Sequence, residues 1–139
     1  MFLPDYSLAI VAIYLLLLMV FLQAIIAAGA HRKQESYVPG IVDENLGPES
    51  FVFRSHRTFM NSLETVPLMV ALAFIAMFVA MDAGWLAILM WVYLAARLAH
   101  MITYYLVATR KNPSLRSYFF MVGVLAQIIL FGLVGFSVL

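Results

Sequence analysis

The feature that most constrains this chain is a set of four apolar runs, each long enough to cross a lipid bilayer. About 20 mostly apolar residues suffice for a transmembrane helix, and the runs cover about 8–30, 57–81, 84–108 and 117–139. Hydrophobic residues make up 65% of the 139-residue sequence and charged residues only 11%, which is unlike a soluble domain. We therefore expect an all-α integral membrane protein, a single domain over residues 1–139 folded as a left-handed, up-down four-helix bundle.

The segments between the runs are expected to be loops of unequal length. Residues 31–50 are polar and contain two turns built from proline and glycine. Residues 81–84 can do little more than reverse the chain, and Pro113 ends any helix that enters 109–117. The first run follows an acidic leader and lacks a small-x-small cleavage site, so we expect a retained span rather than a signal peptide.

The basic residues near the span ends predict the orientation, because Lys and Arg favour the cytoplasmic side. Those assigned to the first and third loops are Arg32, Lys33, Arg54, Arg57, Arg110, Lys111 and Arg116. The N-terminus and the second loop carry only Asp5 and Asp82. We expect both termini on the non-cytoplasmic side and every basic residue except Arg97 at the cytoplasmic face.

Charge and cysteine content exclude several kinds of partner. The net charge is +1 and no long basic block is present, so nucleic acid is not an expected partner. The chain has no cysteine, which excludes disulfides, zinc-thiolate sites and iron-sulfur ligation. We predict no metal site, and any thiol chemistry has to use a thiol that the substrate brings.

Polar side chains form one stripe on each of the two middle spans. Arg54, Arg57, Asn61 and Glu64 are spaced by three and four residues and fall within an arc of roughly 80° on a helix. Arg97, His100 and Tyr104 fall within about 60° on the next span.

A charged group at the centre of a transmembrane helix costs at least ~2.5 to 3.5 kcal/mol on insertion scales. We therefore expect the stripes to face each other, with a Glu64–Arg97 ion pair at the base of a polar cleft.

The stripes have two possible roles. Polar groups between membrane helices often serve only to hold the helices together, which suits Asn61 alone, and Arg54 could be an interfacial anchor. Two matched stripes with extra arginines at the cytoplasmic mouth favour a ligand site. Several guanidiniums, one carboxylate, an amide and a phenol beside lipid suit a small zwitterion with more than one carboxylate, such as glutathione, used with an apolar co-substrate from the bilayer.

These motifs resemble those of the MAPEG family, the membrane-associated proteins in eicosanoid and glutathione metabolism. Arg57-x3-Asn61-x2-Glu64 is similar to the motif of the family's second helix. The stretches "RLAHMITYY" (97–105) and "NPSLRS" (112–117) are similar to the third helix and the start of the fourth in its microsomal prostaglandin E synthase branch; the microsomal glutathione transferases are another branch. The likeness covers nearly the whole chain.

The resemblance implies a homotrimer that binds glutathione, as co-substrate, at subunit interfaces open to the cytoplasm. Carried over to this sequence, the glutathione contacts are Arg57, Asn61, Glu64, His100 and Tyr104, with Arg32 from the neighbouring subunit. It also implies that Arg97, with Glu64, belongs to a polar core between the helices. Arg116 and Ser117 match an Arg-Ser pair that lies near the thiol in the prostaglandin synthase branch. The segment from Tyr104 to Arg116 is longer than in that branch, so Arg110 is the alternative residue near the thiol. The sequence departs from the family pattern at Phe53, Met60 and Phe120, so the electrophile is not specified.

The predicted function is that of a membrane-bound, glutathione-dependent transferase or peroxidase acting on lipophilic electrophiles or hydroperoxides. A nearby arginine lowers the pKa of a thiol by favouring the anion, so Arg116 is the candidate activator, and Tyr104 or Ser117 adds a hydrogen bond to sulfur. The expected location is a bacterial inner membrane, or the endoplasmic reticulum of a eukaryote. The alternative is a non-catalytic, lipid-binding membrane scaffold of the same fold, which would not need the arginines. A small transporter subunit fits less well, because we find no internal repeat.

Overall fold

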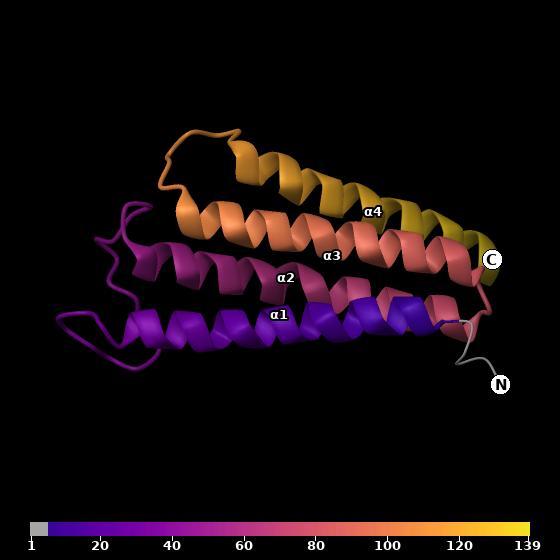
Figure 1. Cartoon of the computed structure of the whole chain (residues 1–139), viewed down its shortest axis with the longest axis horizontal. Helices are drawn as coiled ribbons and strands as arrows, with labels where there is room; N and C mark the ends of the chain where they lie inside the picture. Colours follow the sequence, from indigo (N-terminus) through magenta and orange to yellow (C-terminus); the bar gives the residue numbers. More distant parts are fainter. Residues whose placement is uncertain (1–5) are drawn as a thin grey trace.

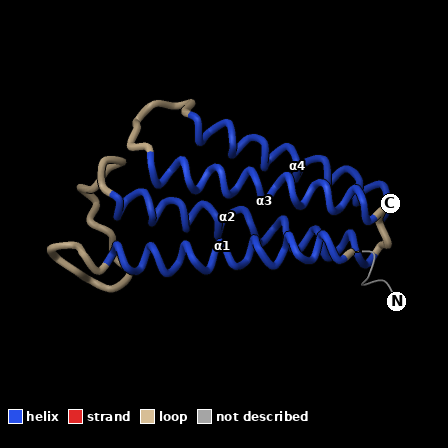
Figure 2. The backbone as a smooth tube through the Cα atoms, in the orientation of Figure 1, coloured by secondary structure: helices blue, strands red, loops and turns tan. Residues whose placement is uncertain are grey.

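The computed structural model describes residues 6–139, and within them the chain forms four helices (Figure 1). They are α1 (Ser7–His31), α2 (Phe51–Phe78), α3 (Ala83–Leu106) and α4 (Leu115–Val138). Each is long and apolar enough to cross a membrane. Residues 6–139 contain no strand beyond an isolated bridge between Val38 and Ile41 (Figure 2). The predicted all-α membrane bundle is confirmed; Asp5, which contributed to the orientation, lies outside the described residues.

The helix α2 begins earlier than hydropathy predicts, at Phe51 rather than near residue 57. Its N-cap residue, Ser50, is extended, with φ −82° and ψ 131°, and the Arg54 N–H donates to the Ser50 carbonyl at 3.1 Å. Arg54 and Arg57 therefore lie in the helix and not in the first loop, to which the sequence analysis assigned them. Hydropathy detects only apolar runs and therefore misses polar helical turns. Arginine is a good helix former, so the first two turns of α2 extend beyond the apolar run.

The four helices run alternately up and down (Figure 1), and the short link between α2 and α3 requires that reversal. Helix α1 packs against α2 and α3, and α4 packs against α3 and touches α2, while α1 and α4 share no contact in the described chain. Both chain ends lie at the same end of the bundle as the link between α2 and α3, and the two longer loops lie at the opposite end (Figures 1 and 2). All basic residues except Arg97 therefore belong to one end, which we call the loop end.

The core changes character along the bundle. Near the chain ends it is apolar and closely packed: Ala12, Leu16, Ala73, Ala76 and Met90 are each 0% exposed. Toward the loop end alanines and polar residues share the interior, and the buried polar residues are Gln23, Ser55, Thr58, Ser62, Arg97 and His100. Small residues allow membrane helices to approach closely. The apolar half thus fixes the helices, and the polar half carries the candidate site.

Candidate functional site

The two predicted stripes meet through Arg97 of α3. Its side chain is 2% exposed, and Nη2 donates to Oδ1 of Asn61 at 2.7 Å and to Oγ of Ser62 at 3.2 Å. Ser62 was not among the predicted site residues. The spacing Ser55, Thr58, Ser62 marks the buried face of α2, and that period of three and four was the signal that could have identified it.

The predicted Glu64–Arg97 ion pair is wrong in the described chain. The only ion pair among residues 6–139 joins Arg110 to Glu49, and Glu64 is exposed on the outer surface of α2. The reason is rotational: Arg97 binds between Asn61 and Ser62, and Glu64 lies about 60° to the other side of Asn61 on a helix with 100° per residue. The stripes therefore contact each other directly through Arg97 and Asn61, and the main pockets of the described residues lie elsewhere, not in the predicted cleft between them.

Aromatic rings continue the site from Arg97 toward the loop end. The His100 ring lies 5.6 Å from the Tyr104 ring and 6.2 Å from the Phe120 ring, between centroids. The Arg97 guanidinium lies 6.0 Å from the Phe120 centroid. Phe120 thus brings α4 against Arg97 and His100, two of the three predicted residues of α3; the sequence had marked its position only as a departure from the family pattern.

Arg116, in the first turn of α4, reaches the same cluster. Its guanidinium carbon lies 4.2 Å from the centroid of the Tyr104 ring, within the range of a cation–π interaction. Ser117 adjoins it, and its Oγ accepts a hydrogen bond from the Ser114 N–H at 3.1 Å. A hydroxyl that accepts in this way keeps its own proton to donate.

Arg110, the alternative to Arg116, is engaged elsewhere. Its Nε and Nη2 donate to Oε1 and Oε2 of Glu49 at 3.0 and 3.2 Å, and both side chains are well exposed. The hydrogen bonds from Arg110 hold the pKa of the Glu49 carboxyl below its usual range, and a backbone hydrogen bond acts in the same direction. A Cβ at position 47 would lie 2.7 Å from Nη2 of Arg110, so Gly47 leaves room for this pair.

The remaining predicted residues do not join the cluster within the single chain. Arg32, Arg57 and Glu64 are all exposed. Arg54 donates to the carbonyls of Pro48 and Glu49 at 2.8 and 2.9 Å, which ties the end of the first loop to the first turn of α2.

Several nitrogens of the cluster have hydrogen-bonding capacity that the protein does not use. Nε of Arg97, Nδ1 of His100 and Nη1 of Arg116 are buried and have no hydrogen-bond partner within residues 6–139. Buried polar atoms are nearly always bonded to protein, water or ligand, so these atoms mark where a polar ligand could bind. The described residues hold no group of three or more His, Cys, Asp or Glu side chains suited to a metal ion.

A comparison with models of protein families identifies the family of this chain. The model of the MAPEG family matches residues 8–136, which is nearly the whole sequence. The chain belongs to the MAPEG family. A comparison with curated proteins finds no significant match. This MAPEG chain thus joins a family with glutathione-dependent transferases and peroxidases and also non-catalytic members, and its four apolar helices place it in a lipid bilayer.

Proposed function

We propose that this MAPEG chain is a membrane-bound, glutathione-dependent transferase or peroxidase for lipophilic electrophiles or hydroperoxides. The observation that carries the proposal is the Arg116 guanidinium, 4.2 Å from the Tyr104 ring at the edge of a cluster with buried, unused hydrogen-bonding nitrogens. The Tyr104 phenol ring and the Arg116 guanidinium thus lie together near the loop end, and Ser117 is adjacent to Arg116 in the sequence.

A guanidinium at this place suits activation of a thiol. A free thiol with pKa ~8.5 is only a few per cent thiolate near neutrality, and a neighbouring cation stabilises the anion. Arg116 would supply that cation, and Tyr104 or Ser117 would donate a hydrogen bond to the sulfur. The proton released from the thiol passes to water.

The thiolate supports two balanced reactions. In conjugation, a carbon–sulfur bond forms and the leaving group departs with its electron pair. In peroxide reduction, the sulfur attacks the distal oxygen, and the alkoxide takes up a proton. The resulting sulfenic acid reacts with a second glutathione to give the disulfide and water.

The rest of the glutathione molecule would bind along α2 and α3. Asn61 and His100 lie beside Arg97, and Arg57 and Glu64 present a guanidinium and a carboxylate on the outer face of α2. A charged side chain within a membrane span needs shelter from lipid. A second copy of the chain that packs on this face and contributes its Arg32 would provide it, and this supports the homotrimer as part of the proposal.

The loop end is the proposed cytoplasmic end of the site. The basic residues outside the spans belong to the two loops there (Figure 1), which fits the positive-inside rule. Glutathione would enter from the cytoplasm and the lipophilic substrate from the bilayer. The proposed location is a bacterial inner membrane, or the endoplasmic reticulum in a eukaryote.

The experiment that tests the proposal pairs calorimetric titration of glutathione with conjugation of 1-chloro-2,4-dinitrobenzene by detergent-solubilised protein. We expect Arg116→Ala to lose about tenfold or more in kcat, with glutathione binding changed little, because the arginine acts on the thiolate. Arg110→Ala removes an equal charge from the neighbouring loop and is the matched control. Full activity in Arg116→Ala would contradict the role of Arg116, and a failure of the wild type to bind glutathione would favour a non-catalytic scaffold.

A further inference from the structure

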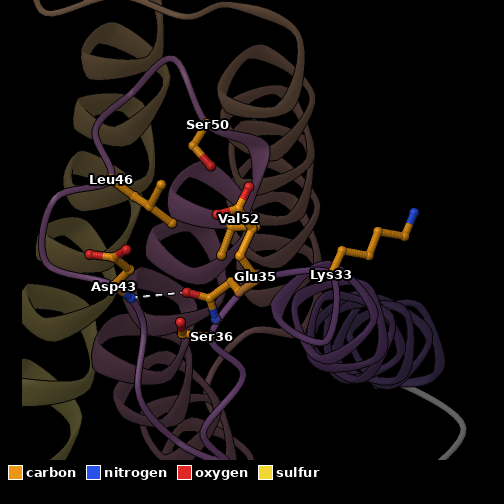
Figure 3. Close-up of a pocket in the computed structure, with 8 residues that line it drawn as sticks. Lys33, Glu35, Ser36, Asp43, Leu46, Ser50 and Val52 are labelled. Carbon is orange, nitrogen blue, oxygen red and sulfur yellow. Dashed lines mark hydrogen bonds between the residues drawn. The ribbon is translucent and has the colours of Figure 1, made fainter.

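Three adjoining pockets on one side of the bundle share lining residues, and together we call them the path. The first, of about 450 Å³, lies in the loop between α1 and α2 (Figure 3). It shares Lys33, Ser50 and Val52 with a second pocket of about 460 Å³ between the ends of these helices. The second shares Ile26 with a third pocket of about 330 Å³ between α1 and α3. None of the predicted glutathione contacts lines this path.

The loop pocket is polar and its walls are ordered by hydrogen bonds. Gln34 fixes the loop, because its Nε2 donates to the His31 carbonyl at 3.1 Å and its Oε1 accepts from the Asp43 N–H at 3.0 Å (Figure 3). Asp43, Glu35 and Ser50 lie together on one side of the pocket, and Lys33 lies on the other side with its ammonium pointing outward (Figure 3). With one ammonium and two carboxylates, the lining has a net negative charge. Its positive group lies apart from its negative groups.

The path becomes apolar as it descends along α1. Ile26, Gly29, Ala30 and Lys33 follow a helical spacing on one face, and a Cβ built on Gly29 would meet nothing within 4 Å. Below Ile26 the groove is lined only by apolar side chains, among them Leu18, Leu22 and Leu98. From Ile26 to Leu15 the apolar groove extends about 16 Å at 1.5 Å per residue, close to one leaflet of a hydrocarbon core ~30 Å thick.

We propose that this path holds one phospholipid whose headgroup carries both a phosphate and a primary ammonium, as in phosphatidylethanolamine. Lys33 binds the phosphate, Glu35 and Asp43 accept hydrogen bonds from the ammonium, and an acyl chain lies in the groove between α1 and α3. The two carboxylates disfavour a purely anionic headgroup, and a trimethylammonium headgroup has no N–H to donate. The depth of the apolar groove and its polar mouth at the loop end match a lipid of one leaflet. The site is separate from the proposed thiol site.

Native mass spectrometry of the delipidated protein, given phospholipids with equal acyl chains and different headgroups, tests the proposal. We expect phosphatidylethanolamine to be retained at least tenfold better than phosphatidylglycerol or phosphatidylcholine. The double variant Glu35→Gln, Asp43→Asn should lose this preference, whereas Glu44→Gln, an exposed loop substitution outside the pocket, should keep it. Equal retention of all three lipids by the wild type would overturn the headgroup assignment.

A second pair of variants tests the groove itself. Gly29→Leu should fill the cleft and lower retention at least tenfold, and Gly132→Leu, at a position in α4 that is equally open, should leave it unchanged. Unchanged retention in Gly29→Leu would overturn the proposal. A benzophenone amino acid at position 18 identifies the occupant directly: a phospholipid adduct supports the proposal, and an adduct with a second copy of the chain contradicts it. Each readout is independent of glutathione.

Discussion

Arg97 is the residue on which the polar half of the bundle depends. It is buried within a membrane span, and its partners in the described chain are neutral: the amide of Asn61, the hydroxyl of Ser62 and the ring of Phe120. Hydrogen bonds to a charged group are worth roughly 1.5 to 3 kcal/mol, and removing one partner of a buried donor exposes its full desolvation cost. The shortest of these contacts, to Asn61 at 2.7 Å, should therefore contribute most to stability.

Replacement of Asn61 by alanine should lower the free energy of unfolding by about 1 to 3 kcal/mol, because Nη2 of Arg97 keeps only the longer bond to Ser62. Thermal melting of the glutathione-free protein in detergent measures this change. Asn61→Asp, which retains an oxygen at the same place and adds a charge opposite that of Arg97, should restore the melting temperature. Glu64→Gln is the informative control, since Glu64 does not contact Arg97; equal losses in Asn61→Ala and Glu64→Gln would mean that the ion pair predicted from the sequence forms after all.

At the scale of elements, the loop end is held together by contacts between segments far apart in sequence. Glu49 joins the first loop to Arg110 in the link between α3 and α4, and Nη2 of Arg116 lies 3.5 Å from the Thr109 carbonyl, next to that pair. Exposed ion pairs are weak and screened by salt. The link before α4 should therefore open more easily than the helices on either side.

Removal of the Glu49 charge should expose this link. We expect trypsin to cleave after Arg110 faster in Glu49→Gln than in the wild type or in the control Glu44→Gln, and added salt should bring the wild type toward the variant.

The pKa of the Glu49 carboxyl is lowered in the folded protein, so the pair is present above the ordinary pKa of a glutamate and is lost as pH falls through the lowered value. The protection of the amides of residues 107–114 against hydrogen exchange, relative to an unstructured peptide at the same pH, should fall over that acidic range. Equal cleavage of the variant and the wild type would show that the pair does not hold the link.

The sequence predicted the elements better than their rotation. Hydropathy located all four spans, and helical spacing correctly indicated that the polar stripes of α2 and α3 meet, because both signals are local. It could not decide that Ser62 rather than Glu64 turns toward Arg97, since that depends on how closely α1 and α3 approach α2. The Glu49–Arg110 pair and the packing of Phe120 were equally out of reach, because they join segments whose separation only the assembled bundle determines.

The half of the bundle near the chain ends is apolar and closely packed, whereas the polar half exposes charged side chains on its outer surface. Leu63, beside Glu64, is 43% exposed, and Glu64 and Arg57 are also exposed on α2. Leucine can face lipid at no cost, whereas a charged group at the centre of a span costs at least ~2.5 to 3.5 kcal/mol. A face that carries both kinds of residue within a membrane is better explained by a protein neighbour than by lipid.

This face should therefore meet other copies of the chain in the membrane, and we expect it to lie beside the symmetry axis of the proposed trimer. The natural sequence has no cysteine, so a single Leu63→Cys substitution reports on one place, and oxidation in native membranes should yield a disulfide-linked pair of chains on a denaturing gel. Ile128→Cys on α4, at a residue 58% exposed in the single chain, is the matched control and should stay monomeric, because a residue meets its own copy only near a symmetry axis. Loss of the Leu63→Cys cross-link in Glu64→Leu would show that the charges hold the copies together, whereas equal cross-linking at both positions would reflect random collision and leave the outer face of α2 to lipid.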